Sequence, residues 1–320
     1  MKTPIASVVC ICLFVAGCGS GTRYTPPGFT PQELEWEGYH EAEKAGRLDE
    51  AAHGYESMCM ADPPYRRACY DHARVLDKAG EKLLCAQSAA SFVSRFPGDA
   101  LAPTGVKLAG RCYLDMDRAQ DGIAALEELA ADVKGKDAWD SVVYRIAKLH
   151  RSAQDTDSEE HTLEKIVNKG RWESQLWDNS IWRLIEISGE RGDIETERRR
   201  LEKFLDSRER SYLIASYNFR HHDDALLRLG KIYFHENRLE KARALFMELA
   251  KWKTSRMRDD GYLWAAKTRL RQGKQGKACR LLSRIIEKMP AANTMKEAIE
   301  LARTSGCDQM KGVQLTTVDQ

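Results

Sequence analysis

The chain has 320 residues, and its 50 Lys and Arg residues are almost balanced by 48 Asp and Glu residues. The resulting net charge of +2 gives no acidic or basic bias, which argues against a nucleic-acid partner. A chain of this length can bury a substantial apolar core, either as one extended domain or as two compact ones.

A short apolar run lies near the N-terminus. It follows Lys2, extends from Ile5 to Ala16 and is about a dozen residues long, which is too short to span a bilayer but suits a signal-peptide core. The run ends in Val15-Ala16-Gly17-Cys18, and these four residues resemble a bacterial lipobox. An ordinary cleaved signal peptide with an incidental cysteine is the alternative.

The lipobox resemblance implies that the Cys18 thiol is diacylated and that residues 1–17 are removed as a signal peptide. Two or three acyl chains give stable membrane attachment, whereas one chain gives only marginal binding. Gly19 and Ser20 differ from the Asp that retains many such proteins in the inner membrane, so the resemblance implies the periplasmic face of the outer membrane. Residues 18–31 are rich in Gly, Thr and Pro, which predicts a flexible tether.

The body of the chain is predicted to be all-α. No proline occurs between Pro103 and Pro290, and this stretch is rich in Ala, Leu, Glu, Lys and Arg, which favour helix. The sequence lacks the runs of Val, Thr and Ile with period-two alternation that are typical of strands.

The clearest repeated unit begins near Asp223. Two apolar stripes at helical spacing are separated by Asn237. Their residues are Leu226, Leu229, Gly230, Tyr233, Ala242, Leu245, Phe246 and Leu249. Small residues such as Gly230 allow two antiparallel helices to approach closely, and Tyr233 and Phe246 fill the space beside them. This unit resembles the tetratricopeptide repeat, a helical hairpin of about 34 residues.

Weaker copies precede and follow this unit. With starts near residues 32, 66, 103, 140, 178, 223 and 259, successive copies are 34, 37, 37, 38, 45 and 36 residues apart. The resemblance implies a right-handed α-solenoid of about seven hairpins over residues 32–305, a capping helix over about 294–304 and a loose tail over 306–320. A helical bundle without repeats is the alternative. The long step before the sixth copy predicts a longer helix or an extended loop over residues 207–222.

Six cysteines follow Cys18, namely Cys59, Cys69, Cys85, Cys112, Cys279 and Cys307. An even number in an exported protein predicts disulfides, and the spacings of cysteine and histidine do not match those of zinc sites. In the repeat arrangement each successive pair is local, so sequential pairing is the simplest connectivity. Buried free thiols are the alternative.

Motifs of catalysis are missing from the sequence: there is no G-x-S-x-G, no P-loop and no H-E-x-x-H. The segment His221-His222-Asp223-Asp224 offers potential metal ligands, but adjacent side chains on a regular element do not converge. We interpret Asp223 or Asp224 as a helix N-cap. We therefore expect no enzyme activity, no cofactor, no metal and no small-molecule substrate.

Aromatic residues gather around the long step before the sixth copy. We interpret most of them, including Trp172, Trp177 and Trp182, as packing. The alternative interpretation is a partner-binding rim, because Tyr and Trp are favoured binding anchors. This rim consists of Tyr212, Tyr217, Phe219 and Arg199 with its neighbouring arginines.

An anchor followed by repeats resembles the lipoprotein scaffolds of outer-membrane protein assembly and envelope maintenance. We expect a membrane-anchored interaction scaffold that binds another envelope protein or peptide in the concave groove of the solenoid. The alternative is a non-catalytic accessory to an enzyme of peptidoglycan turnover.

Overall fold

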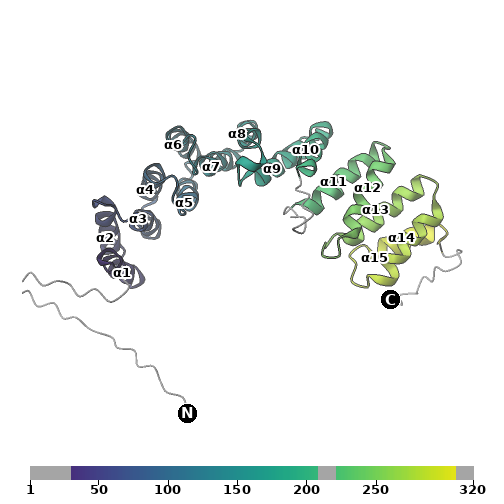
Figure 1. The fold of residues 1–320 in the computed structure, drawn as a ribbon, viewed down its shortest axis with the longest axis horizontal. Helices are drawn as coiled ribbons and strands as arrows, with labels where there is room; N and C mark the ends of the chain where they lie inside the picture. The colour runs from purple at the N-terminus through teal and green to yellow at the C-terminus, as the bar shows by residue number, and fades with distance from the viewer. Residues whose placement is uncertain (1–29, 208–220, 308–320) are drawn as a thin grey trace, which may run out of the picture.

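The computed structural model describes residues 30–207 and 221–307, and over these residues the chain forms fifteen α-helices and one short 3-10 helix, η1. The helices follow one another along an arc (Figure 1). Their bounds are α1 Pro31–Lys44, α2 Leu48–Met60, α3 Arg66–Ala79, α4 Lys82–Arg95, α5 Ala102–Asp115, α6 Ala119–Asp132, α7 Trp139–Ser152, α8 Thr156–Lys169, η1 Arg171–Glu173, α9 Trp177–Glu190, α10 Ile194–Asp206, α11 His222–His235, α12 Leu239–Lys251, α13 Arg258–Arg271, α14 Gln275–Lys288 and α15 Met295–Thr304.

The same turn joins the two helices of each hairpin. One residue of the turn has a left-handed backbone with φ between 57° and 86°. The N–H of the next residue then donates to the carbonyl five residues earlier, at 2.8–3.0 Å, which closes the end of the first helix. The left-handed residues are Gly46, Gly80, Asp117, Gln154, Gly192, Asn237 and Gly273. Their spacings equal those predicted for the repeat starts, which confirms an all-α solenoid of seven hairpins.

The core of each hairpin depends on close helix contacts. In the sixth hairpin, a Cβ on Gly230 would lie 2.4 Å from Cε1 of Phe246, so only glycine allows α11 and α12 to approach this closely. Phe246 is fully buried there, and Tyr233 is 7% exposed. The apolar stripes predicted for this copy therefore form its core. The helix α15 buries Ala298 and Ala302 in the core of the last hairpin, as expected of a cap.

The odd-numbered helices lie on the inner side of the arc (Figure 1). Consistent with this arrangement, α5 contacts both α3 and α7, and α11 contacts α13. The described part of the chain contains no helix with the length and apolar character needed to cross a membrane.

Three disulfides join successive structural units. Cys59–Cys69 links α2 to α3, Cys85–Cys112 links α4 to α5, and Cys279–Cys307 links α14 to the residues that follow α15. These are the sequential pairs. Each therefore crosses from one hairpin to the next, or from the last hairpin to the cap.

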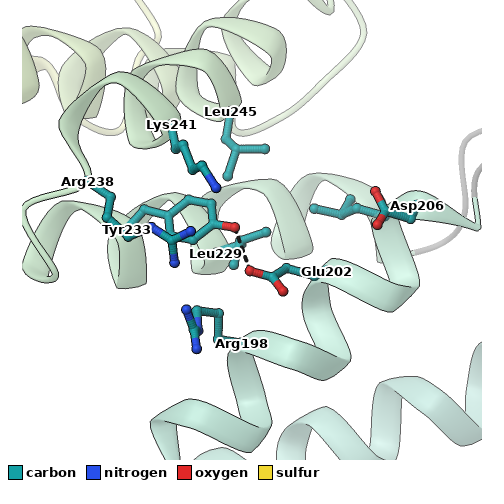
Figure 2. Close-up of a pocket in the computed structure, with 9 residues that line it drawn as sticks. Arg198, Glu202, Asp206, Leu229, Tyr233, Arg238, Lys241 and Leu245 are labelled. Atoms are coloured by element: carbon teal, nitrogen blue, oxygen red, sulfur yellow. Dashed lines mark hydrogen bonds between the residues drawn. The ribbon is translucent and has the colours of Figure 1, made fainter.

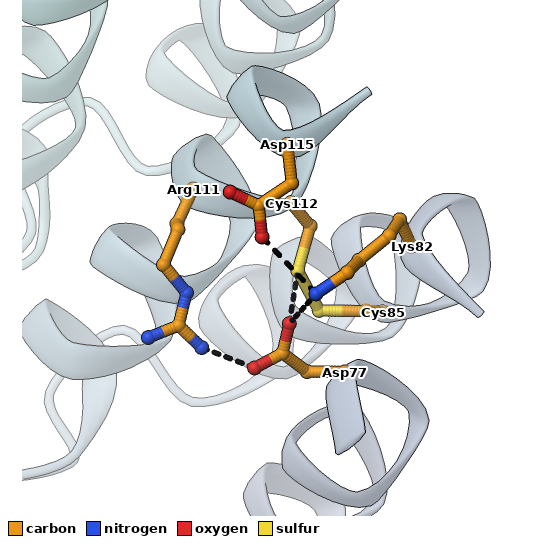
Figure 3. The surroundings of a disulfide bond; sticks show 6 residues. All are labelled: Asp77, Lys82, Cys85, Arg111, Cys112 and Asp115. Atoms are coloured by element: carbon orange, nitrogen blue, oxygen red, sulfur yellow. Dashed lines mark hydrogen bonds and ion pairs between the residues drawn. A yellow bond between two sulfur atoms is a disulfide. The ribbon is translucent and has the colours of Figure 1, made fainter. Parts of the chain in front are cut away.

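A cluster of charges surrounds the second disulfide (Figure 3). Asp77 of α3 lies 2.7 Å from Nζ of Lys82 and accepts a hydrogen bond from Arg111 of α5. Lys82 Nζ also lies 3.0 Å from Asp115 of α5. These ion pairs bridge α3, α4 and α5 next to the Cys85–Cys112 bond, whose sulfurs are fully buried.

A buried ion network joins the first two hairpins. Glu43 of α1 is 5% exposed and accepts hydrogen bonds from Arg74 of α3 at 2.5 Å, from Lys78, and from the Tyr55 hydroxyl at 3.2 Å. Arg74 also donates to the fully buried Asp71 at 2.9 Å. Burial alone would raise the pKa of Glu43, but its hydrogen bonds with Arg74 and Lys78 outweigh burial and lower the pKa to about 2.

We expect the double substitution Cys85→Ala and Cys112→Ala to lower the free energy of unfolding by about 3–4 kcal/mol, because it reopens a loop of 27 residues in the unfolded chain. Denaturant titration measures the change. The matched pair Cys59→Ala and Cys69→Ala opens a loop of only 10 residues and should cost about 1 kcal/mol less. Equal stability of the Cys85/Cys112 variant and the wild type would contradict this account.

Acid should weaken the Glu43 network. Since the folded-state pKa of Glu43 is below its ordinary value of 4.5, its contribution to stability is present above about pH 4.5 and is lost as the pH falls toward 2. We expect the gap in melting temperature between the wild type and Glu43→Gln to narrow between about pH 6 and pH 3. Glu41→Gln, which removes an exposed ion pair with Lys44, serves as the control and should change little. A difference in melting temperature that stays constant from pH 6 to pH 3 would refute the conclusion that ionised Glu43 stabilises the fold.

Candidate binding groove

One row of side chains runs along the inner face of the solenoid. It is formed by the residue six positions before each left-handed turn residue, namely His40, Arg74, Arg111, Lys148, Glu186, Lys231 and Lys267. Contacts of several members with a neighbouring odd-numbered helix place them on this face. Arg111 of α5 pairs with Asp77 of α3, and Lys267 of α13 lies 2.6 Å from Glu297 of α15. We call this set the inner row, and five of its seven members are Lys or Arg.

The middle of the inner face holds three cations that lack an acidic partner among the described residues. Lys107 of α5, Arg145 of α7 and Lys148 of α7 form no ion pair with any described carboxylate. Arg111 and Arg151 flank them but are neutralised, Arg111 by Asp77 and Arg151 by Glu159, which lies 2.8 Å away. We call Lys107, Arg145 and Lys148 the unpaired cation cluster.

The surroundings of this cluster disfavour its positive charge. Burial lowers the pKa of Lys148, and the neighbouring charges of Arg145, Arg151 and Lys107 lower it further. Burial likewise lowers the pKa of Arg145, and the charge of Arg111 acts in the same direction. Positive charges of α5 and α7 that no carboxylate compensates therefore lie close together in this part of the inner face.

Gly110 explains how Arg145 fits against α5. A Cβ at this position would lie 2.3 Å from Cδ of Arg145, so the aliphatic part of the arginine crosses α5 where the backbone has no side chain. Nζ of Lys148 lies 5.7 Å from the centroid of the Tyr144 ring. Gly110 and Tyr144 are thus neighbours of the two α7 cations.

The C-terminal part of the groove is aromatic. Trp264 of α13 lies between Nζ of Lys231, 4.9 Å from its ring centroid, and Nζ of Lys267, 4.1 Å away. Phe234 of α11 makes an edge contact with Trp264 at 5.6 Å, and the guanidinium of Arg271 lies 4.9 Å from the Phe234 ring. These cations are held by aromatic faces within the protein.

A separate pocket of about 470 Å³ lies between α10 and α12 (Figure 2). At its centre the Tyr233 hydroxyl donates to Glu202 at 2.6 Å. Burial and this carboxylate raise the pKa of Tyr233 to about 12. Arg238 lies above the Tyr233 ring at 4.3 Å and is 3.1 Å from Glu236. Tyr233 and Glu202, at the centre of the pocket, are therefore paired with each other.

The residues predicted for the partner-binding rim are only partly described. Tyr212, Tyr217 and Phe219 lie outside the described residues, as does Cys18. Arg199 is an exposed residue of α10, an even-numbered helix, and donates to the Thr196 hydroxyl at 3.0 Å. The rim hypothesis therefore stays a prediction, with Arg199 on α10 and not on one of the inner helices.

The aromatic residues before the long step have mixed environments. Trp177 is 2% exposed and donates to the Val167 carbonyl at 3.2 Å, which agrees with a packing role. Trp182 stacks on His221 with ring centroids 4.3 Å apart. By contrast, Trp172 of η1 is 75% exposed.

Two groups of potential metal ligands require comment. The N-cap of α11 is His221, so the expectation that Asp223 or Asp224 caps the helix was wrong; both lie in its first turn, where carboxylates favour the helix dipole. Donor atoms of Asp77, Cys85 and Cys112 lie within 4.8 Å of one another, but these cysteines are joined in a disulfide and cannot act as thiolate ligands. This group does not fit a metal.

The sequence analysis missed the inner row because it followed only apolar spacing. Arg74, Arg111 and Lys148 are spaced 37 residues apart, and Lys231 and Lys267 are 36 apart. These distances equal the local repeat steps. Reading the charged residues at the repeat period would have found the row.

Comparisons with known proteins agree with this architecture. A family model for the tetratricopeptide repeat matches residues 224–251, which lie within the sixth hairpin. The C-terminal part of a TPR repeat-containing protein from Cytophaga hutchinsonii is similar in structure, with a TM-score of 0.50 and 15% identity over 76% of this chain and 90% of that chain. No curated protein matches the sequence.

Two further solved structures resemble the chain less closely. A tetratricopeptide repeat protein from Parabacteroides merdae is 13% identical over 85% of this chain and 98% of its own, with a TM-score of 0.37. The TPR2AB domain of yeast Sti1, in its complex with pHSP90, is 10% identical over 86% of this chain and 98% of its own, with a TM-score of 0.34. The seven hairpins and the family match show that this chain is built from tetratricopeptide-like repeats.

Proposed function

We propose that this protein is a non-catalytic scaffold of the bacterial cell envelope that holds a segment of another envelope protein in its concave groove. Solenoids of tetratricopeptide-like repeats are generally protein-interaction scaffolds. The observation that supports this role most directly is the series of cations in the inner row from α3 to α13, with Phe234 and Trp264 beside its C-terminal members. Such an extended surface suits a long contact with a protein segment.

The arrangement of the polar groups supports a binding role without catalysis. Catalysis needs a nucleophile, a base or a metal that converges on one reacting atom. In the described pocket, Tyr233 and Glu202 are hydrogen-bonded to each other, and the strongly shifted Glu43 belongs to an ion network that packs helices together. These groups stabilise the fold.

The proposed attachment rests on Val15-Ala16-Gly17-Cys18, with Cys18 as the lipidated residue. The three disulfides support an oxidising compartment, because disulfides persist in exported proteins. We infer the periplasmic face of the outer membrane as the location. A lipid anchor there would place the solenoid in the periplasm together with other envelope proteins.

Cys18→Ser should abolish lipidation, because it removes the thiol that accepts the lipid. We expect loss of palmitate labelling and accumulation of unprocessed precursor on a gel. Cys69→Ser, which removes a cysteine of the repeat body, is the control and should leave labelling intact. Normal labelling and processing of the Cys18→Ser protein would sink the anchor proposal, and sedimentation of the wild type with inner-membrane markers would contradict the location.

Site-specific photocrosslinking in living cells tests the groove. A photoreactive residue in place of Thr104, which is exposed on α5 one helical turn before Lys107, should yield adducts with a partner protein. The same residue in place of Gln120, exposed on the even-numbered helix α6, is the matched control and should not. Equal adducts at the two positions, or adducts only at position 120, would place the partner elsewhere.

A further inference from the structure

We propose that the unpaired cation cluster, Lys107, Arg145 and Lys148, is a recognition site for the carboxylates of an acidic segment of the partner protein. This inference rests on the proposed scaffold function and names the chemistry of its partner. It follows from the contrast between this cluster and the other cations of the inner face.

The other Lys and Arg residues of the inner row have partners within the protein. Arg74 binds Glu43 and Asp71, Arg111 binds Asp77, Lys267 binds Glu297, and Nζ of Lys231 lies 4.9 Å from the centroid of the Trp264 ring. Lys107, Arg145 and Lys148 have no carboxylate partner among the described residues. The guanidinium of half-buried Arg145 offers five N–H donors, and the described part of the protein supplies no acceptor for them. A bound carboxylate would supply acceptors for these donors through charge-assisted hydrogen bonds.

The charges around the cluster explain why the protein itself does not supply the anion. Glu159, a buried carboxylate of α8, accepts hydrogen bonds from Arg151 at 2.8 Å and from Arg183 at 2.9 and 3.1 Å. Glu186 of α9 is likewise paired with Arg183 at 3.3 Å. These carboxylates are already shared between arginines, so Arg145 and Lys148 remain uncompensated.

Carboxylates match the cluster better than a long polyanion does. The guanidinium of Arg145 can bind a carboxylate through two parallel hydrogen bonds, and Lys107 and Lys148 add point charges on two neighbouring helices. The positive surface is short, because the next member of the inner row is Glu186 and it is followed on α9 by the exposed Glu190. A nucleic acid or an anionic glycan that continued along the groove would meet these carboxylates. A short run of Asp and Glu fits the patch.

Tyr144 and Gly110 give the site its shape. The Tyr144 ring is half-buried, packs against the hydrophobic core and lies with its centroid 5.7 Å from Nζ of Lys148. Gly110 leaves the space in which the Arg145 side chain crosses α5. A side chain added at Gly110 must displace Arg145 and so disturb the site without removing a charge.

The direct test is fluorescence anisotropy with the full-length protein in detergent. The probes are a labelled acidic peptide of about ten residues, its counterpart with Asn and Gln in place of Asp and Glu, and a single-stranded DNA of similar charge. We expect the wild type to bind the acidic peptide, to ignore the amide peptide and to bind the DNA more weakly. Equal binding of the peptide pair, or tighter binding of DNA, would overturn the proposal.

Variants locate the site. Arg145→Gln with Lys148→Gln should weaken binding of the acidic peptide by roughly tenfold or more, since charge-assisted hydrogen bonds are lost. Lys134→Gln with Lys136→Gln removes the same charge from exposed positions between α6 and α7 and should change affinity less than about twofold. Gly110→Val should weaken binding with the charge unchanged. Equal affinities in the Arg145/Lys148 and Lys134/Lys136 variants would refute the site.

Thermal stability separates recognition from a structural role. Because Arg145 and Lys148 repel neighbouring cations, their replacement by Gln should leave the melting temperature unchanged or raise it. A clear fall would assign the pair to the fold and not to binding. The photocrosslink at position 104 separates the two proposals. If adducts persist in the Arg145/Lys148 variant, the scaffold function stands and acidic recognition is rejected. If the wild type gives no adducts, the scaffold function itself is rejected.

Discussion

The left-handed turn inside each hairpin is the constraint on which the rest of the structure depends. It reverses the chain in a few residues and closes the first helix with one backbone hydrogen bond, so the two helices pack side by side at once. Because the turn recurs seven times with the same geometry, equivalent residues of successive hairpins reach the same face. The inner row is a direct consequence of this repetition, since a residue six positions before the turn always lies on the concave side.

Most of the fold could be predicted from the sequence, because glycine and apolar spacing carry the signal of a repeat. Gly46, Gly80, Gly192 and Gly273 occupy left-handed positions, and Gly230 permits the helix contact that Phe246 fills. The third and fourth copies keep the predicted repeat spacing although their turn residues are Asp117 and Gln154 and not glycine. The local pairing of cysteines followed from the same arrangement, since in a solenoid each hairpin contacts only its neighbours.

The ion pairs were harder to predict, because they depend on the angle between hairpins as well as on spacing. Glu159 is only 2% exposed and binds Arg151 and Arg183, which come from two different hairpins. In the sequence, Glu159 and Glu160 stand among basic residues, a pattern typical of a solvated helix face, yet Glu159 is buried. Neighbouring helices bury this carboxylate, so that it joins two hairpins. The spacing of apolar residues does not indicate which carboxylates will be buried in this way.

The candidate site lies where two modes of stabilisation meet. Disulfides tie the first three hairpins together covalently, and Lys107 belongs to the last of these three. Arg145 and Lys148 belong to the fourth hairpin, which is held to the third by packing of α7 against α5 and α6. An acidic segment bound to all three cations would therefore bridge a covalently linked part of the groove and a part held by packing alone. Neutralising the repulsion across this boundary would favour the closed contact of α5 with α7, so that binding of the segment and stabilisation of the groove depend on the same charges.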